Sequence, residues 1–249
     1  MGDDNVVSRL GSFKALFGIV AGAGASYGIY KLIFDRDVLS KSAASLEPRH
    51  LSMLLSLLQS SPKPEERRKV LVTLGNAAAF TVNQDLLREF GGLHIIAGFL
   101  SDPSPEIQVQ TLNALNNLSM NICNQEQLKI YVPSVMQMIE MSPVNSDLQL
   151  AALRLLTNLS VTDNHQHLMK NSITLLLSLL IVSNDIQVLK VLVNLSSNPD
   201  LMDDIVRFRS AQFGERILLQ FFSKGNKIIF CRYTTFLSSC KAFQIYKKS

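Results

Sequence analysis

Val72-Thr73-Leu74-Gly75-Asn76-Ala77 is the first of four segments that align without gaps around one asparagine. The other three are Asn113-Ala114-Leu115-Asn116-Asn117-Leu118, Arg154-Leu155-Leu156-Thr157-Asn158-Leu159 and Lys190-Val191-Leu192-Val193-Asn194-Leu195. The asparagines are 41 (76 to 117), 41 (117 to 158) and 36 (158 to 194) residues apart, and a leucine stands two positions before each. This period is typical of solenoids with two or three helices per repeat. We expect the four leucines to lie in a continuous core, because one repeat cannot bury its apolar face alone.

Other features of the chain recur with a similar period. An apolar stretch precedes each asparagine segment, and a proline or a polar residue follows most of these stretches. We expect these stretches, residues 51–58, 93–100, 135–141 and 175–182, to form further helices. Polar pairs also recur at 41-residue steps: Asn83-Gln84, Asn124-Gln125 and His165-Gln166. Gly91-Gly92 is expected to mark the bend between a short helix and the next one.

The composition is that of a folded chain without a nucleic-acid-binding surface. Of the 249 residues, 47% are apolar and 18% are charged, which excludes disorder as the main state. The net charge of +4 comes from the end of the chain, since residues 223–249 hold six basic residues and no acidic ones. The rest of the chain is close to neutral, so we expect no phosphate-binding surface.

No motif of catalysis or cofactor binding is present in the sequence. It contains no P-loop, GxSxG or HExxH pattern, and its three cysteines are too scattered for a zinc site. His165 and His167 lie near Asp163, which leaves a metal site open, but the three residues are better interpreted as capping a helix start. We therefore expect no enzyme activity, no cofactor and no metal.

Residues 15–30 carry no charge and lie between Lys14 and Lys31. With the apolar residues that follow, residues 15–34 are expected to form one N-terminal transmembrane signal-anchor helix. The run is rich in small residues, including two GxxxG patterns: Gly18 with Gly22, and Gly24 with Gly28. Such a spacing permits close packing of two helices and hence a homodimer. The alternative is that these glycines only keep the anchor weakly hydrophobic.

A cleaved signal peptide is the main alternative to this anchor, because Ala23-Gly24-Ala25 is similar to a cleavage site. The acidic start at Asp3 and Asp4 disfavours it. Three glycosylation patterns, at Asn117, Asn158 and Asn194, lie within expected helices, where glycans would obstruct packing. We therefore expect the anchor to be retained and the body of the chain to face the cytosol.

The aligned segments resemble armadillo repeats. Together with Ser26-Tyr27-Gly28-Ile29-Tyr30-Lys31-Leu32 before the repeats, they resemble the membrane-anchored armadillo-repeat proteins over residues 15–222. The resemblance implies an all-α, armadillo-type right-handed α-solenoid. It also implies a location in the mitochondrial outer membrane or the endoplasmic reticulum membrane, facing the cytosol. Relatives are associated with mitochondrial distribution and with binding of regulatory proteins, including transcription factors, which affects growth.

The same resemblance places Asn76, Asn117, Asn158 and Asn194 in a concave groove, where such asparagines bind the backbone of an extended peptide. An amide side chain offers both a donor and an acceptor to a peptide group. The alternative is that these asparagines bond locally between repeats.

Four residues earlier, on the same helical face, stand Val72, Asn113, Arg154 and Lys190. No tryptophan stands there, which disfavours a nuclear-import receptor, and the two basic residues favour acidic or phosphorylated segments, unless they are only solvated charges.

These observations predict five parts of the chain. They are an N-terminal segment (1–14), the signal-anchor helix (15–34), a linker (35–47), an armadillo-repeat domain (48–222) and a divergent basic tail (223–249). The expected function is a non-catalytic, membrane-anchored scaffold that binds other proteins through the groove and does not bind nucleic acid. The first alternative is a soluble or nuclear armadillo regulator that binds a transcription factor. The second is a structural dimer whose groove is empty or filled by the chain's own tail.

Overall fold

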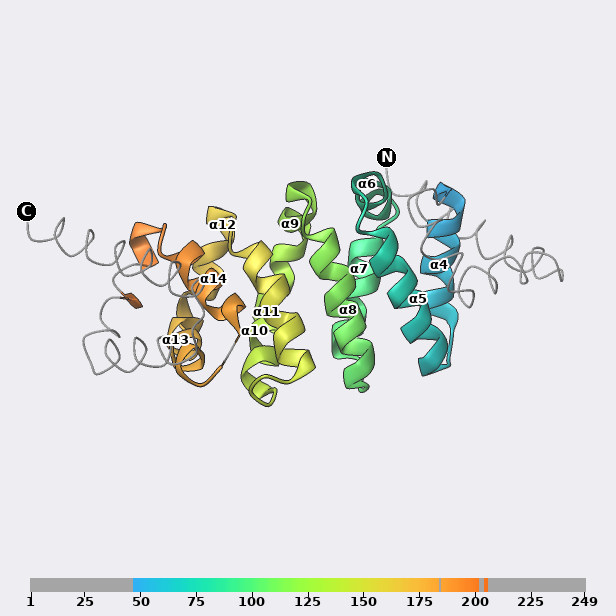
Figure 1. Cartoon of the computed structure of the whole chain (residues 1–249). Coiled ribbons are helices and arrows are strands. Elements are labelled where there is room, and N and C mark those ends of the chain that lie inside the picture. The colour runs from blue at the N-terminus through green and yellow to red at the C-terminus, as the bar shows by residue number, and fades with distance from the viewer. Residues whose placement is uncertain (1–46, 184, 202–203, 206–249) are drawn as a thin grey trace, which may run out of the picture. The chain divides into compact units, whose positions relative to one another are not determined.

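A computed structural model describes residues 47–183, 185–201 and 204–205 (Figure 1). The regular structure of these residues is helical throughout. The α-helices are α4 (Pro48–Ser60), α5 (Pro64–Ala77), α6 (Thr81–Glu89), α7 (Gly92–Ala97), α8 (Pro105–Leu118), α9 (Ile122–Leu128), α10 (Val132–Met141), α11 (Asp147–Leu159), α12 (Asp163–Gln166), α13 (Ile173–Val182) and α14 (Ile186–Leu195). Three 3-10 helices, η2 (Gly98–Ser101), η3 (Lys129–Tyr131) and η4 (His167–Ser172), connect them.

The predicted anchor, with Gly18, Gly22, Gly24 and Gly28, and the predicted basic tail lie outside the described residues. Within the described part of the chain, no helix combines the length and the apolar character that crossing a bilayer requires.

The helices stack as repeats of one three-helix unit. The long helices α5, α8, α11 and α14 pack side by side in chain order (Figure 1). A second helix, α4, α7, α10 or α13, packs against the long helix that follows it. The short helices α6, α9 and α12 lie along the upper edge in Figure 1. The described residues thus form an all-helical solenoid, as the 41-residue period predicts.

The core of this solenoid is made by the repeated leucines. Leu74, Leu115, Leu156 and Leu192 all have 0% exposed surface, so the prediction that they lie in the core is confirmed. Each stands two residues before its asparagine on a long helix whose neighbours cover it. Because burying a leucine side chain stabilises a fold by about 1.5–3 kcal/mol, these positions are a main source of cohesion between repeats.

Local sequence explains where the long helices begin. Proline at the first position starts α5 (Pro64) and α8 (Pro105), where its missing N–H costs nothing. The other two long helices have polar side-chain caps: Ser146 Oγ accepts from the Gln149 N–H at 3.3 Å, and Asp185 Oδ1 accepts from the Gln187 N–H at 2.9 Å.

The helix that packs against α8, α7, differs from the prediction. Residues 93–100 were expected to form one helix, but α7 ends at Ala97 and continues as the 3-10 helix η2. The bend before α7 is confirmed, since Gly91 has a φ of 69°, in the left-handed region that favours glycine. At Gly92, an added Cβ would lie 2.8 Å from the Leu87 carbonyl oxygen, so this packing requires glycine.

Candidate protein-interaction face

The four asparagines lie on the four long helices that stack side by side, α5, α8, α11 and α14. Asn76 is exposed, and Asn117, Asn158 and Asn194 are half-buried. We call the surface formed by these residues and those four positions earlier the asparagine face; its members are Val72, Asn76, Asn113, Asn117, Arg154, Asn158, Lys190 and Asn194. All eight side chains reach the surface, since none of them is buried.

Three of the asparagines also bond to the preceding repeat. Asn117 Nδ2 donates to the Gly75 carbonyl oxygen at 2.9 Å. Asn158 Nδ2 donates to the Asn116 carbonyl oxygen at 3.2 Å and to Ser119 Oγ at 2.9 Å. Asn194 Nδ2 repeats this arrangement with the Thr157 carbonyl oxygen at 3.2 Å and Ser160 Oγ at 2.9 Å. The row of asparagines therefore links each long helix to the one before it.

The serine of the Asn-Leu-Ser pattern completes this link. Ser119 Oγ donates to the Asn116 carbonyl oxygen at 2.7 Å, and Ser160 Oγ donates to the Thr157 carbonyl oxygen at 2.8 Å. Each hydroxyl hydrogen is used within its own repeat, so the oxygen is free to accept from the asparagine of the next repeat. In the first repeat Ala78 takes the serine position, and Asn117 Nδ2 accordingly donates only to the backbone oxygen of Gly75.

The hydrogen-bonding capacity left for a ligand changes along the face. Asn158 and Asn194 each have two acceptors in the preceding repeat for their two amide hydrogens, which leaves Oδ1 as the group available to a ligand. Asn117 donates one amide hydrogen to Gly75 and retains the other. Asn76 forms no hydrogen bond with any described residue through its side chain.

The charge of the face also changes along its length. Val72 and Asn113 are uncharged and half-buried, Arg154 is exposed, and Lys190 is half-buried. Neither Arg154 nor Lys190 forms an ion pair or a side-chain hydrogen bond with a residue that the structure describes. The other Lys and Arg side chains in this part of the chain have partners: Lys63, Arg67, Arg68, Lys69, Arg88, Lys129 and Lys170 form ion pairs, and Arg49 also has an interaction partner.

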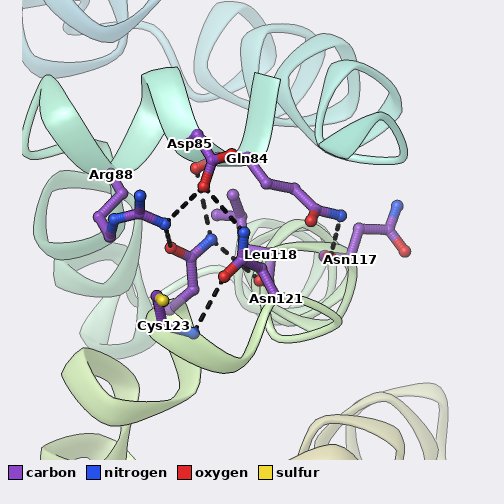
Figure 2. A network of polar contacts seen from close by, with 8 residues as sticks. Gln84, Asp85, Arg88, Asn117, Leu118, Asn121 and Cys123 are labelled. Carbon is purple, nitrogen blue, oxygen red and sulfur yellow. Dashed lines mark hydrogen bonds and ion pairs between the residues drawn. The ribbon is translucent and has the colours of Figure 1, made fainter. Parts of the chain in front are cut away.

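The recurring polar pairs have a structural role that the sequence did not reveal. Gln84 Nε2 donates to the Asn117 carbonyl oxygen at 3.1 Å (Figure 2). It also donates to the Ala78 carbonyl oxygen at 2.9 Å, so it bridges two repeats. Gln166 bridges the Ser160 and Asn194 carbonyl oxygens in the same way, at 3.0 and 3.2 Å. These glutamines are buried, and their bonds satisfy carbonyl oxygens at the ends of long helices.

A charged contact between repeats lies beside this bridge. Asp85 Oδ1 accepts from Arg88 Nη1 at 2.7 Å and from Asn121 Nδ2 at 2.9 Å (Figure 2). Arg88 Nη1 also donates to Asn124 Oδ1 at 3.0 Å, and Asn121 Oδ1 caps α9 by accepting from the Cys123 N–H. The Arg88 and Asn121 hydrogen bonds lower the pKa of Asp85. This network fixes α9 to α6, and its members are occupied with one another.

The hypothesis that Asp163, His165 and His167 cap a helix start is wrong. The residue before α12 is Thr162, and its side chain makes no capping bond. His165 is buried instead: its Nδ1 lies 3.2 Å from the Leu159 carbonyl oxygen and its Nε2 lies 3.2 Å from Glu126 Oε2. It occupies the place of Asn83 and Asn124 in other repeats. No group of three or more His, Cys, Asp or Glu residues suited to a metal ion is found where the structure describes the chain.

Stacked three-helix units with an asparagine link at every step match a known family. The sequence profile described as "Armadillo-like" matches residues 46–245. The chain belongs to the Armadillo-like family. The match extends beyond residue 222, where the predicted armadillo-repeat domain ends.

Several solved structures share the fold of this chain. An engineered protein is 17% identical, with a TM-score of 0.70, and the match covers 87% of this chain and 96% of the other. A designed armadillo repeat protein in complex with the peptide (KR)4 is 15% identical, with a TM-score of 0.68 over 86% and 98% of the chains. Computationally designed armadillo repeat proteins for modular peptide recognition are 16% identical, with a TM-score of 0.68 over 85% and 98%. At these identities the likeness concerns the fold.

Proposed function

We propose that this chain is a non-catalytic scaffold that binds an extended segment of a partner protein across the asparagine face. The observation that carries the proposal is the row of four amide side chains on adjacent helices, one of them exposed and three half-buried, all of which reach the surface. Amides at regular intervals suit a peptide backbone, which presents alternating N–H and C=O groups. Designed armadillo repeat proteins with the same fold recognise peptides, one of them the basic peptide (KR)4.

We further propose that the chain belongs with the membrane-anchored armadillo-repeat proteins that include armadillo repeat-containing protein 10. In this proposal residues 15–34 anchor it in the mitochondrial outer membrane or the endoplasmic reticulum membrane. The repeats then face the cytosol and act in organelle distribution or growth regulation. The uncharged, lysine-flanked run at residues 15–30 supports the anchor, and its GxxxG patterns support pairing of two anchors.

The peptide-binding proposal is tested by selection from a random 12-residue peptide display library, with the full-length chain in mild detergent as bait. We expect the wild-type chain to enrich binding peptides. The double variant Asn76→Tyr/Asn113→Tyr should lose them, because two large rings would cover the face without breaking a described hydrogen bond. The matched control is Ser134→Tyr/Gln137→Tyr on exposed positions of α10. Failure to enrich any peptide, or equal loss in both variants, would contradict the proposal.

The anchor is tested separately by alkaline carbonate extraction of membranes from cells that express the full chain. We expect the chain to remain in the membrane pellet and a variant without residues 15–34 to be released. Release of the intact chain would contradict the anchor and favour the soluble or nuclear regulator.

A further inference from the structure

We propose that the asparagine face has two halves of different chemistry, and that the half on α11 and α14 selects peptide segments with carboxylate side chains. This inference rests on the proposed function and adds a ligand class to it. The half on α5 and α8 is uncharged and retains amide donors. The half on α11 and α14 offers two cations in place of those donors.

The first argument comes from charge pairing. Among the Lys and Arg residues that the structure describes, the only two without a carboxylate or other partner there are Arg154 and Lys190, and both lie on this one face. They occupy the same position, four residues before the asparagine, in consecutive repeats. Asp147 is the one carboxylate within α11 and α14. It lies seven residues from Arg154, about 10 Å along the helix at 1.5 Å per residue, which is too far for an ion pair.

The second argument comes from the asparagines beside these cations. Asn158 and Asn194 direct their amide hydrogens to acceptors in the preceding repeat, so each presents an acceptor oxygen to a ligand. In this half the available donors are therefore the Arg154 guanidinium and the Lys190 ammonium. In the other half, Asn76 and Asn117 still have amide hydrogens to donate, beside the neutral Val72 and Asn113. A ligand that bonds with both halves of the face therefore needs anionic acceptors only in the part that lies on α11 and α14.

Carboxylates fit this arrangement better than phosphate groups do. Each repeat supplies one cation, which matches the single charge of an Asp or Glu side chain. A phosphorylated side chain carries nearly two charges and is bound best by clusters of arginine. The Arg154 guanidinium presents a planar pair of donors that suits a carboxylate, and Lys190 adds a compact charge one repeat further on.

The basic end of the chain does not have the chemistry to occupy this half. Residues 223–249 contain six basic residues and no acidic one, so Arg154 and Lys190 would repel them. The face therefore favours an acidic segment from a partner protein over this chain's own tail. The same repulsion sets this chain apart from the designed armadillo repeat protein that binds (KR)4.

The test uses the peptide selection described above and compares the composition of the enriched peptides. We expect wild-type bait to enrich Asp and Glu over the starting library and the double variant Arg154→Glu/Lys190→Glu to enrich Lys and Arg instead. The control is Lys63→Glu/Lys170→Glu, which changes the net charge equally at two exposed positions outside the face. This control should keep the wild-type preference, and circular dichroism should show that all variants are folded.

A binding measurement on one selected peptide then completes the test. By fluorescence anisotropy, we expect Arg154→Glu/Lys190→Glu to weaken binding of the acidic peptide roughly tenfold or more. Raised salt should also weaken binding of this peptide to the wild-type chain. The synthetic peptide (KR)4 should bind the wild-type chain more weakly than the variant. This inference would be overturned if the selected peptides showed no enrichment of Asp and Glu, or if the wild-type chain and Arg154→Glu/Lys190→Glu selected the same composition. The scaffold proposal would then still stand. A stronger preference for phosphoserine analogues than for Glu peptides would also overturn it, and no enrichment at all would overturn both.

Discussion

Asn158 and Ser119 show how single side chains hold neighbouring repeats together. The serine hydroxyl uses its hydrogen within its own repeat and offers its oxygen to the asparagine of the next one. Both side chains therefore have partners: Ser119 is buried, and Asn158 is bonded in this way although it is only half-buried. The same residue type serves two purposes along one row: cohesion at Asn158 and Asn194, and open hydrogen-bonding capacity at Asn76.

Replacing Asn158 by alanine should therefore destabilise the fold, whereas replacing Asn76 should not. Asn158→Ala removes the bonds to Ser119 Oγ and to the Asn116 carbonyl oxygen, so we expect a loss of about 1–2 kcal/mol in the free energy of unfolding. Asn76→Ala removes an exposed side chain without a described hydrogen bond and should change stability by less than about 0.5 kcal/mol. Urea unfolding followed by circular dichroism measures both. Equal effects of the two substitutions would contradict the role assigned to the links between repeats.

At the scale of the helix, much of the architecture follows from the sequence. The periodic leucines and the residues that start helices, such as Pro64, Pro105 and Asp185, locate the long helices because apolar spacing and capping act locally. The direction of the Asn158 amide could not be predicted in this way. It depends on which carbonyl oxygen of the neighbouring helix lies opposite, and that is set by packing. His165 was misinterpreted for the same reason, since its partner Glu126 is supplied by another repeat.

Glu65, in the first turn of α5, should make the stability of the fold depend on pH. Hydrogen bonds from Arg68 lower the pKa of Glu65 from 4.5 to about 2, and Lys69 adds to the effect. Because the folded state holds the carboxylate in its charged form, this contribution is fully present above pH 4.5. It is lost as the pH falls from 4.5 towards about 2.

Glu65→Gln should therefore lower the melting temperature at pH 7, and the difference from the wild-type chain should shrink on going to pH 3. Thermal unfolding at a series of pH values measures this difference. Glu140→Gln is the control, because Glu140 is exposed on α10 and forms no ion pair with a described residue. A difference that stays constant between pH 7 and pH 3 would contradict the assignment.

At the scale of the molecule, stability is a sum over repeats and the contacts between them. Consecutive long helices contact each other, from α5 through α8 and α11 to α14, so the described repeats form a linear series. A substitution in the middle of such a series weakens two interfaces, whereas one in the first described helix weakens contacts on one side. Position along the chain should therefore decide how far the effect of a substitution spreads.

Leu115 and Leu51 allow this expectation to be tested with the same chemical change. Both side chains are fully buried, and each substitution by alanine should cost about 2–5 kcal/mol through lost contacts and a cavity. Leu115 lies on α8, which packs against both α5 and α11, and Leu51 lies on α4, which packs against α5, α6 and α7.

Hydrogen exchange measured by mass spectrometry should show faster exchange on both sides of α8 in Leu115→Ala. In Leu51→Ala, the increase should be confined to α4–α7, because coupling between repeats falls off along the series. Uniform acceleration of all helices in both variants would mean that the array unfolds as one unit, and that its stability is not divided among its repeats.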